Sequence, residues 1–334
     1  MRILGLSGRD SGCGYHRVLL PLTFMPDYVR LVTDAPNEVM INRGWDLLLY
    51  NRVCALDNDW DYTKSNMNVK VVCDMDDDWI LPPNHIANYN YQLIKDRIIH
   101  NIREADLVTT TNEILADKIS KYNTNIQIFE NALPYGVDQF MNNKEPSEFI
   151  RLFWCGSITH EHDINILRNP LKRIDNKNVQ MVMGGYNSAN DTSRDIWDRM
   201  ASSFTNNKKI NFKLLTNEPP TKYMAMYQEA DIALIPLEKS DWHACKSNLK
   251  ILEAAAKKIP CIVSAVSPYY DYKDCPVLWV HNQRDWFKHI NYLVKNEKER
   301  QKLGSELYQW AATKFNLRVI NERRKAAFES LIKS

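Results

Sequence analysis

The sequence has no long apolar segment. A helix that spans a membrane needs about 18 or more consecutive, mostly apolar residues, and no run in this chain approaches that length. The chain begins MRILGLSG, which is typical of a strand that enters a glycine loop and not of a secretory signal peptide. We therefore expect a cytoplasmic protein with no stable insertion into a membrane.

The cysteines do not form a recognisable framework either. There are seven of them, an odd number, with no C-x-x-C pair and no histidine at metal-ligand spacing. This distribution is typical of reduced thiols and not of disulfides or a structural zinc site. We expect no metal and no bound cofactor.

The chain also lacks an excess of charge of one sign. Lys and Arg number 43 against 41 Asp and Glu, which gives a formal net charge of +2. No overall field therefore demands nucleic acid or an anionic membrane as a partner. The length of 334 residues, with 44% hydrophobic and 25% charged residues, predicts an ordinary globular chain of two domains.

Short apolar strands alternate with helical or loop segments along the chain. We expect strands at 2–6, 28–32, 46–50, 69–73, 106–110, 126–129, 150–155, 179–183, 210–214, 231–236, 260–264 and 277–280. This alternation is typical of parallel α/β sheets. The polar, irregular segment 139–149 separates two such series and predicts an interdomain linker.

A glycine loop follows the first predicted strand. Gly12 and Gly14 precede an apolar, helix-like run, and such a loop can bring backbone N–H groups close to a phosphate. The third glycine of the dinucleotide fingerprint and a Walker lysine are both missing, so a plain tight turn is the alternative. We expect Tyr15, His16 and Arg17, at the start of the next helix, to face whatever the loop faces.

The fourth predicted strand runs into an acidic stretch. Asp74, Asp76, Asp77 and Asp78 lie at its carboxyl end, which is where ligands bind in open α/β sheets. Three interpretations remain: a metal site, an acceptor-hydroxyl site with one carboxylate as base, or caps and turns that open the next helix. His85, further along the loop, either lines an active site or lies at the surface.

The second series of strands also carries glycines at strand ends. Gly156 and Ser157 follow its first strand and precede a helix start, which is a position for an anion. His160 can reach a phosphate or a sugar ring from there, although helix capping with surface histidines is the alternative. The next strand ends in Gly184 and Gly185.

The segment 242–264, WHACKSNLKILEAAAKKIPCIVS, joins a loop, a helix start and a buried strand. Lys246 and Lys250 are four residues apart, so on a helix that opens near Ser247 they share one face beside unpaired backbone N–H groups. That arrangement suits a diphosphate. Glu253 can accept hydrogen bonds from two neighbouring sugar hydroxyls. The alternative is a solvated lysine face on an amphipathic helix.

The order of these segments resembles the GT-B fold of retaining glycosyltransferases, in particular the nucleotide-sugar-dependent family that includes sucrose synthases and mannosyltransferases. The resemblance is strongest in YQEADIALIPL and KSNLKILEAAAKKIPCIVS. GCGYHR, VVCDMDDDW, EADLVTTTNEILADKI, ENALPYGVD and GSITHEHDI look like a branch that includes bacteriophage and surface-polysaccharide transferases. The resemblance implies two Rossmann-like domains facing a central cleft, an acceptor domain over 1–138 and a donor domain over 150–312. It also implies a C-terminal helix over 313–334 that packs back towards the acceptor domain.

The resemblance also implies roles for single residues. Lys246 and Lys250 would hold the donor diphosphate, and Glu253 would bind the ribose. The other donor contacts implied are Gly14, Gly156, Ser157, His160, Gly184, Gly185 and Ser247. The acceptor contacts implied are Tyr15, His16, Arg17, Asp76, Asp78 and His85. The catalytic group implied is Lys246, Lys250, Asp76, Asp77 and Asp78.

One position departs from the family pattern. Counting eight residues back from Glu253, where the family often has another glutamate near the donor sugar, reaches Cys245. Asp241, Trp242 and His243 are the residues that we expect to take its place.

The expected activity is transfer of a hexose or pentose, with retention, from a nucleoside diphosphate sugar, with a uridine diphosphate (UDP) sugar favoured. Lys246, Lys250 and Ser157 would stabilise the charge on the departing diphosphate without a metal. The acceptor stays open between a bacterial glycan, a glycolipid and a hydroxymethylated pyrimidine of phage DNA, and a DNA acceptor predicts salt-dependent binding to duplex. The alternatives are a nucleotide-sugar epimerase and a non-catalytic nucleotide-sugar-binding protein. The oligomeric state is left open.

Overall fold

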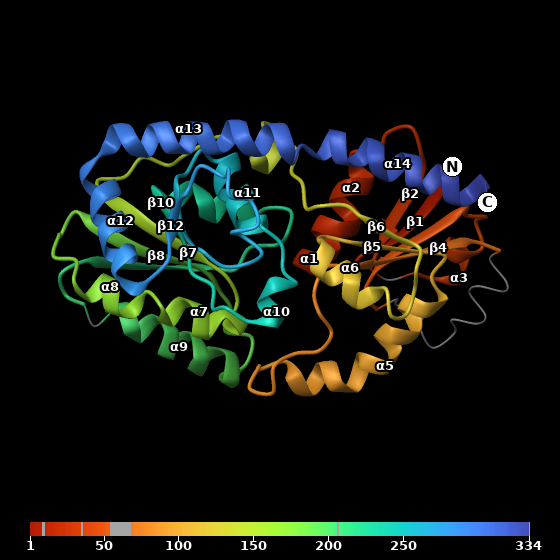
Figure 1. The fold of residues 1–334 in the computed structure, drawn as a ribbon, viewed down its shortest axis with the longest axis horizontal. Helices are drawn as coiled ribbons and strands as arrows, with labels where there is room; N and C mark the ends of the chain where they lie inside the picture. Colours follow the sequence, from red (N-terminus) through yellow and green to blue (C-terminus); the bar gives the residue numbers. More distant parts are fainter. Residues whose placement is uncertain (9–10, 35, 54–67, 206, 334) are drawn as a thin grey trace. The chain divides into compact units, whose positions relative to one another are not determined.

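The structure, a computed structural model, describes residues 1–8, 11–34, 36–53, 68–205 and 207–333. It divides into two compact units, each with its own parallel sheet (Figure 1). Unit 1 comprises Met1–Ala132, Ala244–Ser247 and Phe315–Ser334. Unit 2 comprises Leu133–His243 and Asn248–Lys314.

The sheet of unit 1 has six parallel strands in the order β2-β1-β3-β4-β5-β6. The strands are β1 Arg2–Leu6, β2 Val29–Thr33, β3 Leu47–Asn51, β4 Lys70–Met75, β5 Leu107–Thr110 and β6 Ile126–Ile128. The central strands β3, β4 and β5 are apolar along most of their length because helices cover both faces of a parallel sheet. The order reverses direction between β1 and β3, so the loops that follow these two strands flank a topological switch point.

Helices close both faces of this sheet. They are α1 Gly12–Gly14, the π-helix η1 Tyr15–Leu19, α2 Leu20–Thr23, α3 Glu38–Ile41, α5 Asn88–Glu104, α6 Glu113–Ile119 and α14 Leu317–Lys333. Ile98 and Ile102 of α5 pack in one apolar cluster with strand residues, and Phe328 and Leu331 of α14 pack in another. The Asn321 side chain also donates to the Pro21 carbonyl at 2.9 Å, which fixes α14 to α2.

The sheet of unit 2 also has six parallel strands, in the order β12-β11-β10-β7-β8-β9. The strands are β7 Ile150–Cys155, β8 Val179–Tyr186, β9 Asn211–Thr216, β10 Ile232–Ile235, β11 Cys261–Ser264 and β12 Leu278–Val280. The helical elements are η3 Asp138–Phe140, η4 Ile158–His160, α7 Glu161–Asn165, α8 Arg168–Lys172, α9 Asp191–Thr205, η5 Tyr223–Glu229, α10 Asp241–Ala244, α11 Leu249–Ala256, α12 Gln283–Lys295 and α13 Glu297–Lys314. The last residue of α10, Ala244, is the first residue of the Ala244–Ser247 segment of unit 1. Here the switch point lies between β7 and β10.

The predicted α/β class with two parallel sheets is confirmed, and each predicted strand is present with its ends shifted by a few residues at most. Within the described ranges, no helix combines the length and apolar character that crossing a membrane requires. The helix predicted near Ser247 is also present, but it carries only one of the two lysines placed on it. The helix expected to open near Ser247 begins at Leu249, with Asn248 as its N-cap, so Lys246 lies before the helix and Lys250 lies on it.

Candidate functional site

The first group of candidate residues lies at the switch point of unit 2. Connections leave β7 towards β8 and leave β10 towards β11, in opposite directions across the sheet. The loops after β7 and β10 therefore border the crevice in which open α/β sheets bind ligands. Three predicted donor residues, Gly156, Ser157 and His160, follow β7, and His243 follows β10.

Lys250 occupies the first turn of α11, where backbone N–H groups have no partner within the helix. Its ammonium group donates a hydrogen bond to the carbonyl oxygen of Cys155, the last residue of β7, and lies 5.8 Å from the ring centroid of Trp154. The carbonyl is neutral, so an anion at this place can offer the ammonium stronger, charge-assisted hydrogen bonds.

Glu253 lies one turn further along α11 and is buried. The Tyr223 hydroxyl donates to its Oε1 at 2.8 Å, and the Tyr227 hydroxyl donates to its Oε2 at 2.5 Å. Burial raises the pKa of this carboxyl, and the two tyrosine hydrogen bonds and Lys250 oppose that rise. The tyrosines thus orient the carboxylate. Sequence reasoning missed them because they precede Glu253 by 30 and 26 residues.

The glycines at the ends of β7 and β8 have a packing explanation. Gly185 has φ of 101°, and a Cβ there would collide with the carbonyl oxygen of Gly156. A Cβ at Gly156 would lie 2.7 Å from the Trp154 ring, and the Gly156 N–H donates to the Gly184 carbonyl at 3.3 Å. Close approach of two backbones requires these glycines whether or not a phosphate binds there.

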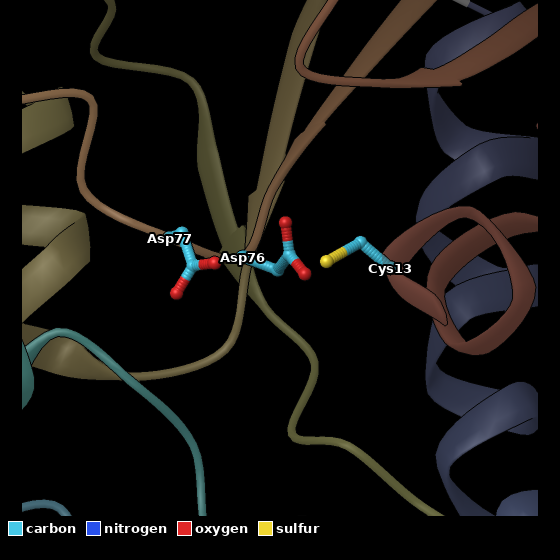
Figure 2. A group of neighbouring side chains, drawn as sticks. All are labelled: Cys13, Asp76 and Asp77. Atoms are coloured by element: carbon cyan, nitrogen blue, oxygen red, sulfur yellow. The ribbon is translucent and has the colours of Figure 1, made fainter. Parts of the chain in front are cut away.

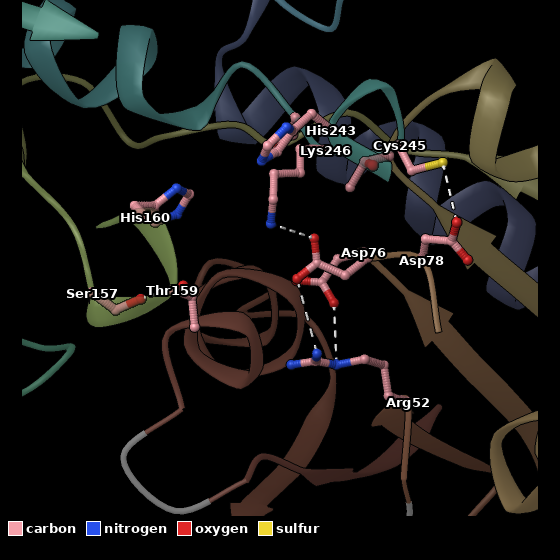
Figure 3. Close-up of polar contacts among 12 residues, drawn as sticks. Arg52, Asp76, Asp78, Ser157, Thr159, His160, His243, Cys245 and Lys246 are labelled. Carbon is pink, nitrogen blue, oxygen red and sulfur yellow. Dashed lines mark hydrogen bonds and ion pairs between the residues drawn. The ribbon is translucent and has the colours of Figure 1, made fainter. Parts of the chain in front are cut away.

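A carboxylate joins two histidines at the same edge of unit 2. The Asp163 side chain is 2% exposed, and its Oδ2 lies 2.7 Å from His160 Nδ1 and 3.7 Å from His243 Nε2. The Glu238 N–H donates to Oδ1 at 2.8 Å. Burial tends to raise the pKa of this carboxyl, but the histidines and the Glu238 N–H outweigh it and the pKa is lowered. Figure 3 shows His160 close to Thr159, which is partly buried, and to Ser157, which is exposed, in the segment after β7.

The second group of candidate residues lies at the carboxyl edge of the unit 1 sheet. Cys13 follows β1, Arg52 follows β3, and Asp76 and Asp77 follow β4. Figure 2 shows the side chains of Cys13, Asp76 and Asp77. Ligand atoms of Cys13, Asp76 and Asp77 all lie within 4.8 Å of one another. The Arg52 guanidinium is 3.5 Å from Asp76 and 3.9 Å from Asp77, and Lys246 Nζ is 3.2 Å from Asp77 (Figure 3).

These distances bear on the metal interpretation of the acidic stretch. Two cationic side chains already neutralise Asp76 and Asp77. Burial and the Asp76 charge raise the pKa of the Cys13 thiol well above its usual value. Among the described residues, Arg52 and Lys246 thus form an ion-pair network with the two aspartates. Sequence reasoning missed Arg52, whose φ of 59° marks a constrained backbone at a strand end.

Asp78 was predicted to contact the acceptor, and the structure does not support that role. Its side chain is 2% exposed, forms an ion pair with Lys118, and accepts a hydrogen bond from the Ile80 N–H at 3.0 Å. The Sγ atom of buried Cys245 lies 3.9 Å from it (Figure 3). Asp78 therefore turns inward because Lys118 supplies a partner for its charge.

Arg17 was predicted to contact the acceptor and is instead a core residue. It is 1% exposed, and its Nε and Nη2 donate to the two carboxylate oxygens of Asp74, both at 2.9 Å. Nη1 donates to the Phe129 carbonyl at 2.8 Å and to Asn131 Oδ1 at 2.9 Å. The prediction failed because β4 extends through Met75, which places Asp74 inside the sheet, where its charge needs a buried partner.

The other residues predicted to contact the acceptor are buried or form hydrogen bonds within the protein. Tyr15 and His16 are both 8% exposed. Burial, with Arg17 next to it, lowers the pKa of His16 to about 3, so the ring is neutral. His85 is partly buried, and its Nδ1 accepts a hydrogen bond from the Ala87 N–H at 3.1 Å, which stabilises a turn before α5. Direct acceptor contact by Tyr15 and His16 is therefore not supported.

The segment Ala244–Ser247 belongs to unit 1, although it lies between two stretches of unit 2 in the sequence. The Asn112 side chain donates to the carbonyl oxygens of Cys245 and Lys246, both at 3.0 Å, and Asn131 Nδ2 donates to Ser247 Oγ at 2.7 Å. The prediction that Lys246 and Lys250 share one helix face is therefore wrong, since Lys246 is held in unit 1 against Asp77.

Gly14, also predicted to contact the donor, has a packing role in unit 1. A Cβ at this position would lie 2.9 Å from the backbone nitrogen of Gly8 and 3.3 Å from Ser7. The Ser11 hydroxyl accepts a hydrogen bond from the Gly14 N–H at 3.1 Å, which caps the short helix α1. These contacts hold Gly14 against Ser7 and Gly8.

Comparison with known proteins identifies the fold. No protein-family model matches the sequence, and no curated protein matches it significantly. Among solved structures, HepE of Anabaena in complex with UDP and glucose is similar with a TM-score of 0.69 at 13% identity, over 99% of this chain and 100% of HepE. The sucrose-phosphate synthase of Thermosynechococcus elongatus has a TM-score of 0.66 at 13% identity, over 92% of this chain and 83% of the synthase.

A trehalose-phosphate synthase of Burkholderia xenovorans is similar at 9% identity, with a TM-score of 0.62 over 86% of this chain and 75% of that protein. Similarity at such low identity concerns the fold. The two parallel six-stranded sheets are those of the GT-B glycosyltransferases.

Proposed function

We propose that the protein is a glycosyltransferase that uses a nucleoside diphosphate sugar, with a UDP-sugar favoured. The observation that carries this proposal is the pair Lys250 and Glu253 on α11: a cation at the helix start beside the end of β7, and a carboxylate one turn later held by two tyrosines. The cation can bind a diphosphate, and the carboxylate can accept hydrogen bonds from the hydroxyl groups of a ribose. The similarity to HepE, whose structures hold UDP and UDP-glucose, supports the choice of donor.

In the proposed reaction, the bond between the sugar C1 and the diphosphate oxygen breaks, and the acceptor hydroxyl oxygen bonds to C1. The hydroxyl proton passes to the departing diphosphate. Lys250, exposed Ser157 and the N-terminus of α11 stabilise the negative charge that develops on the leaving group. The chemistry proposed needs no metal and proceeds with retention of configuration.

The acceptor is assigned to unit 1. Asp76 and Asp77, held by Arg52 and Lys246, are partly buried carboxylates at the carboxyl edge of the unit 1 sheet. Carboxylates of this kind can accept hydrogen bonds from an acceptor hydroxyl. A bacterial glycan, a glycolipid and a hydroxymethylated pyrimidine of phage DNA all supply such a hydroxyl.

The proposal is tested by following nucleotide release from UDP-glucose in the presence of each acceptor class, with NMR to define the anomer of the product. Lys250→Ala should lower the rate about a hundredfold, as expected for loss of a group that stabilises the leaving charge. Lys239→Ala removes an exposed lysine of the loop after β10 and should leave the rate unchanged. An altered sugar without an acceptor would indicate an epimerase, and binding without turnover would indicate a binding protein.

A further inference from the structure

The side chains of His160, Asp163 and His243 are held in place by burial and by hydrogen bonds. The carboxylate between the histidines is almost fully buried and is fixed by the Glu238 N–H at 2.8 Å. His243 is 8% exposed, and both its Nδ1 and its backbone N–H lie close to the Ser240 hydroxyl, at 3.0 and 3.1 Å. Both rings are therefore held in one orientation.

The buried carboxylate also sets the hydrogen-bonding character of His160. Because an ionised carboxylate only accepts hydrogen bonds, the Nδ1 atom at 2.7 Å from Asp163 must carry a proton. In the neutral ring, Nε2 is then an acceptor, and in the protonated ring it is a donor. Sugar hydroxyls can pair with either form, since each hydroxyl both donates and accepts.

The position of this group within unit 2 relates it to the donor site. The connections β7 to β8 and β10 to β11 run in opposite directions from the switch point, and parallel crossovers are right-handed. Helix α7, which carries Asp163, and helix α11, which carries Glu253, therefore cover opposite faces of the sheet, as Figure 1 shows. Lys250 reaches the carbonyl of Cys155, at the end of the strand that leads to His160.

The parts of a nucleotide sugar follow one another in a line, as do Glu253, Lys250 and the group of His160, Asp163 and His243 in unit 2. The nucleoside and the sugar are attached to opposite ends of the diphosphate. With Glu253 on the nucleoside side and Lys250 at the diphosphate, the part that faces the α7 side is the sugar. Resting on the proposed function, we propose that His160 and His243, positioned by Asp163, bind the hydroxyl groups of the transferred sugar.

The experiment measures dissociation constants by calorimetry for the full chain with uridine, guanosine, adenosine and cytidine diphosphates and with the corresponding glucose conjugates. The readout is the ratio of the affinity for the nucleotide sugar to the affinity for the nucleotide alone. His160→Gln and His243→Asn should lower this ratio about tenfold, the effect of one lost hydrogen bond to a polar group, while the affinity for the nucleotide alone stays within about twofold.

Two further variants make the result specific. Asp163→Asn removes the charge that orients both rings and should lower the ratio in the same direction as the histidine variants. His162→Asn changes an exposed histidine next to the group and should leave the ratio unchanged. Retained nucleotide affinity in each variant shows that unit 2 is folded.

The outcomes distinguish this proposal from the proposed function. If the wild-type protein binds nucleotides and the ratio is unchanged in both His160→Gln and His243→Asn, sugar binding by the histidines is refuted while the donor site stands. A parallel loss of affinity for nucleotide and nucleotide sugar also refutes it. If the wild-type protein binds none of the nucleotides, the donor function itself is refuted, and this proposal with it.

Discussion

Lys246 Nζ lies 3.2 Å from Asp77 Oδ1, although 169 residues separate the two in the sequence. Both side chains are partly buried, and both belong to unit 1. Asn112 holds the backbone of the Lys246 segment in place through two hydrogen bonds of 3.0 Å. The pairing ties the basic residue that precedes α11 to the acidic turn after β4, and it makes the charge of Lys246 part of the unit 1 network.

Replacing Asp77 by Asn should impair use of the acceptor. The change removes one of two carboxylates assigned to the acceptor and leaves Lys246 without its ion pair. We expect the KM for the acceptor to rise about tenfold, the effect of one lost polar contact, with unchanged affinity for the nucleotide. Asp117→Asn, at an exposed position of α6, is the control. Loss of nucleotide affinity in Asp77→Asn would contradict the assignment.

Replacing Arg17 by Met should destabilise the protein by about 3–5 kcal/mol, because the buried Asp74 carboxylate loses its charged partner. Denaturant unfolding followed by tryptophan fluorescence measures this. The double variant Arg17→Met with Asp74→Leu should recover much of the stability, since no buried charge is left unpaired. A stable Arg17→Met protein with a raised KM for the acceptor would restore the role first predicted from the sequence.

The stability of the protein should fall in mild acid, in part because of His16. Burial and Arg17 lower the pKa of this ring to about 3, against an unfolded value of about 6.5. Between these values the unfolded chain binds the extra proton, so stability is full above about pH 6.5 and decreases as the pH falls towards 3. The slope contributed is about 1.4 kcal/mol per pH unit.

The His16→Gln variant removes this titrating group. Denaturant unfolding at several pH values between 4 and 7 should show a shallower loss of stability than in the wild-type protein, by about one proton. Equal slopes in the two proteins would mean that His16 is accessible and ordinary, which would contradict its place in the core.

Replacing Tyr227 by Phe should weaken nucleotide binding less than replacing Glu253 by Gln. Tyr227→Phe removes one of two hydrogen bonds that orient the carboxylate, whereas Glu253→Gln removes the ribose-binding charge itself. We expect losses of about fivefold and about thirtyfold in affinity, in line with a neutral and a charged hydrogen bond. Calorimetric titration measures both, and the reverse order would argue against Glu253 as the ribose ligand.

The sequence predicted the strands well because each strand of a buried parallel sheet is a short apolar run, as in Leu47–Asn51 and Ile232–Ile235. It also predicted which strand ends carry polar residues. What it could not predict is the choice of long-range partners. Whether Asp74 faces solvent or Arg17 depends on where β4 ends, and nothing local to either residue fixes that.

The same limit explains the errors in the candidate site. Lys246 and Lys250 have helical spacing, but the hydrogen bonds from Asn112 and Asn131 hold residues 245–247 outside the helix. From the sequence, His160 was expected to reach a phosphate or a sugar ring, and its contact with Asp163 was not predicted. The addition of His243, 80 residues later, follows only from the adjacency of β7 and β10 in the sheet.

We propose above that α11 and the end of β7 bind the diphosphate of a nucleotide sugar. The most direct measurement is a thermal-shift titration of the wild-type protein and Lys250→Ala with the four nucleoside diphosphates and their sugars. A ligand that binds only the folded state raises the melting temperature by mass action. We expect an upward shift with one nucleotide that disappears in Lys250→Ala. No shift at millimolar concentration, or an equal shift in both proteins, would show that Lys250 does not hold a donor diphosphate.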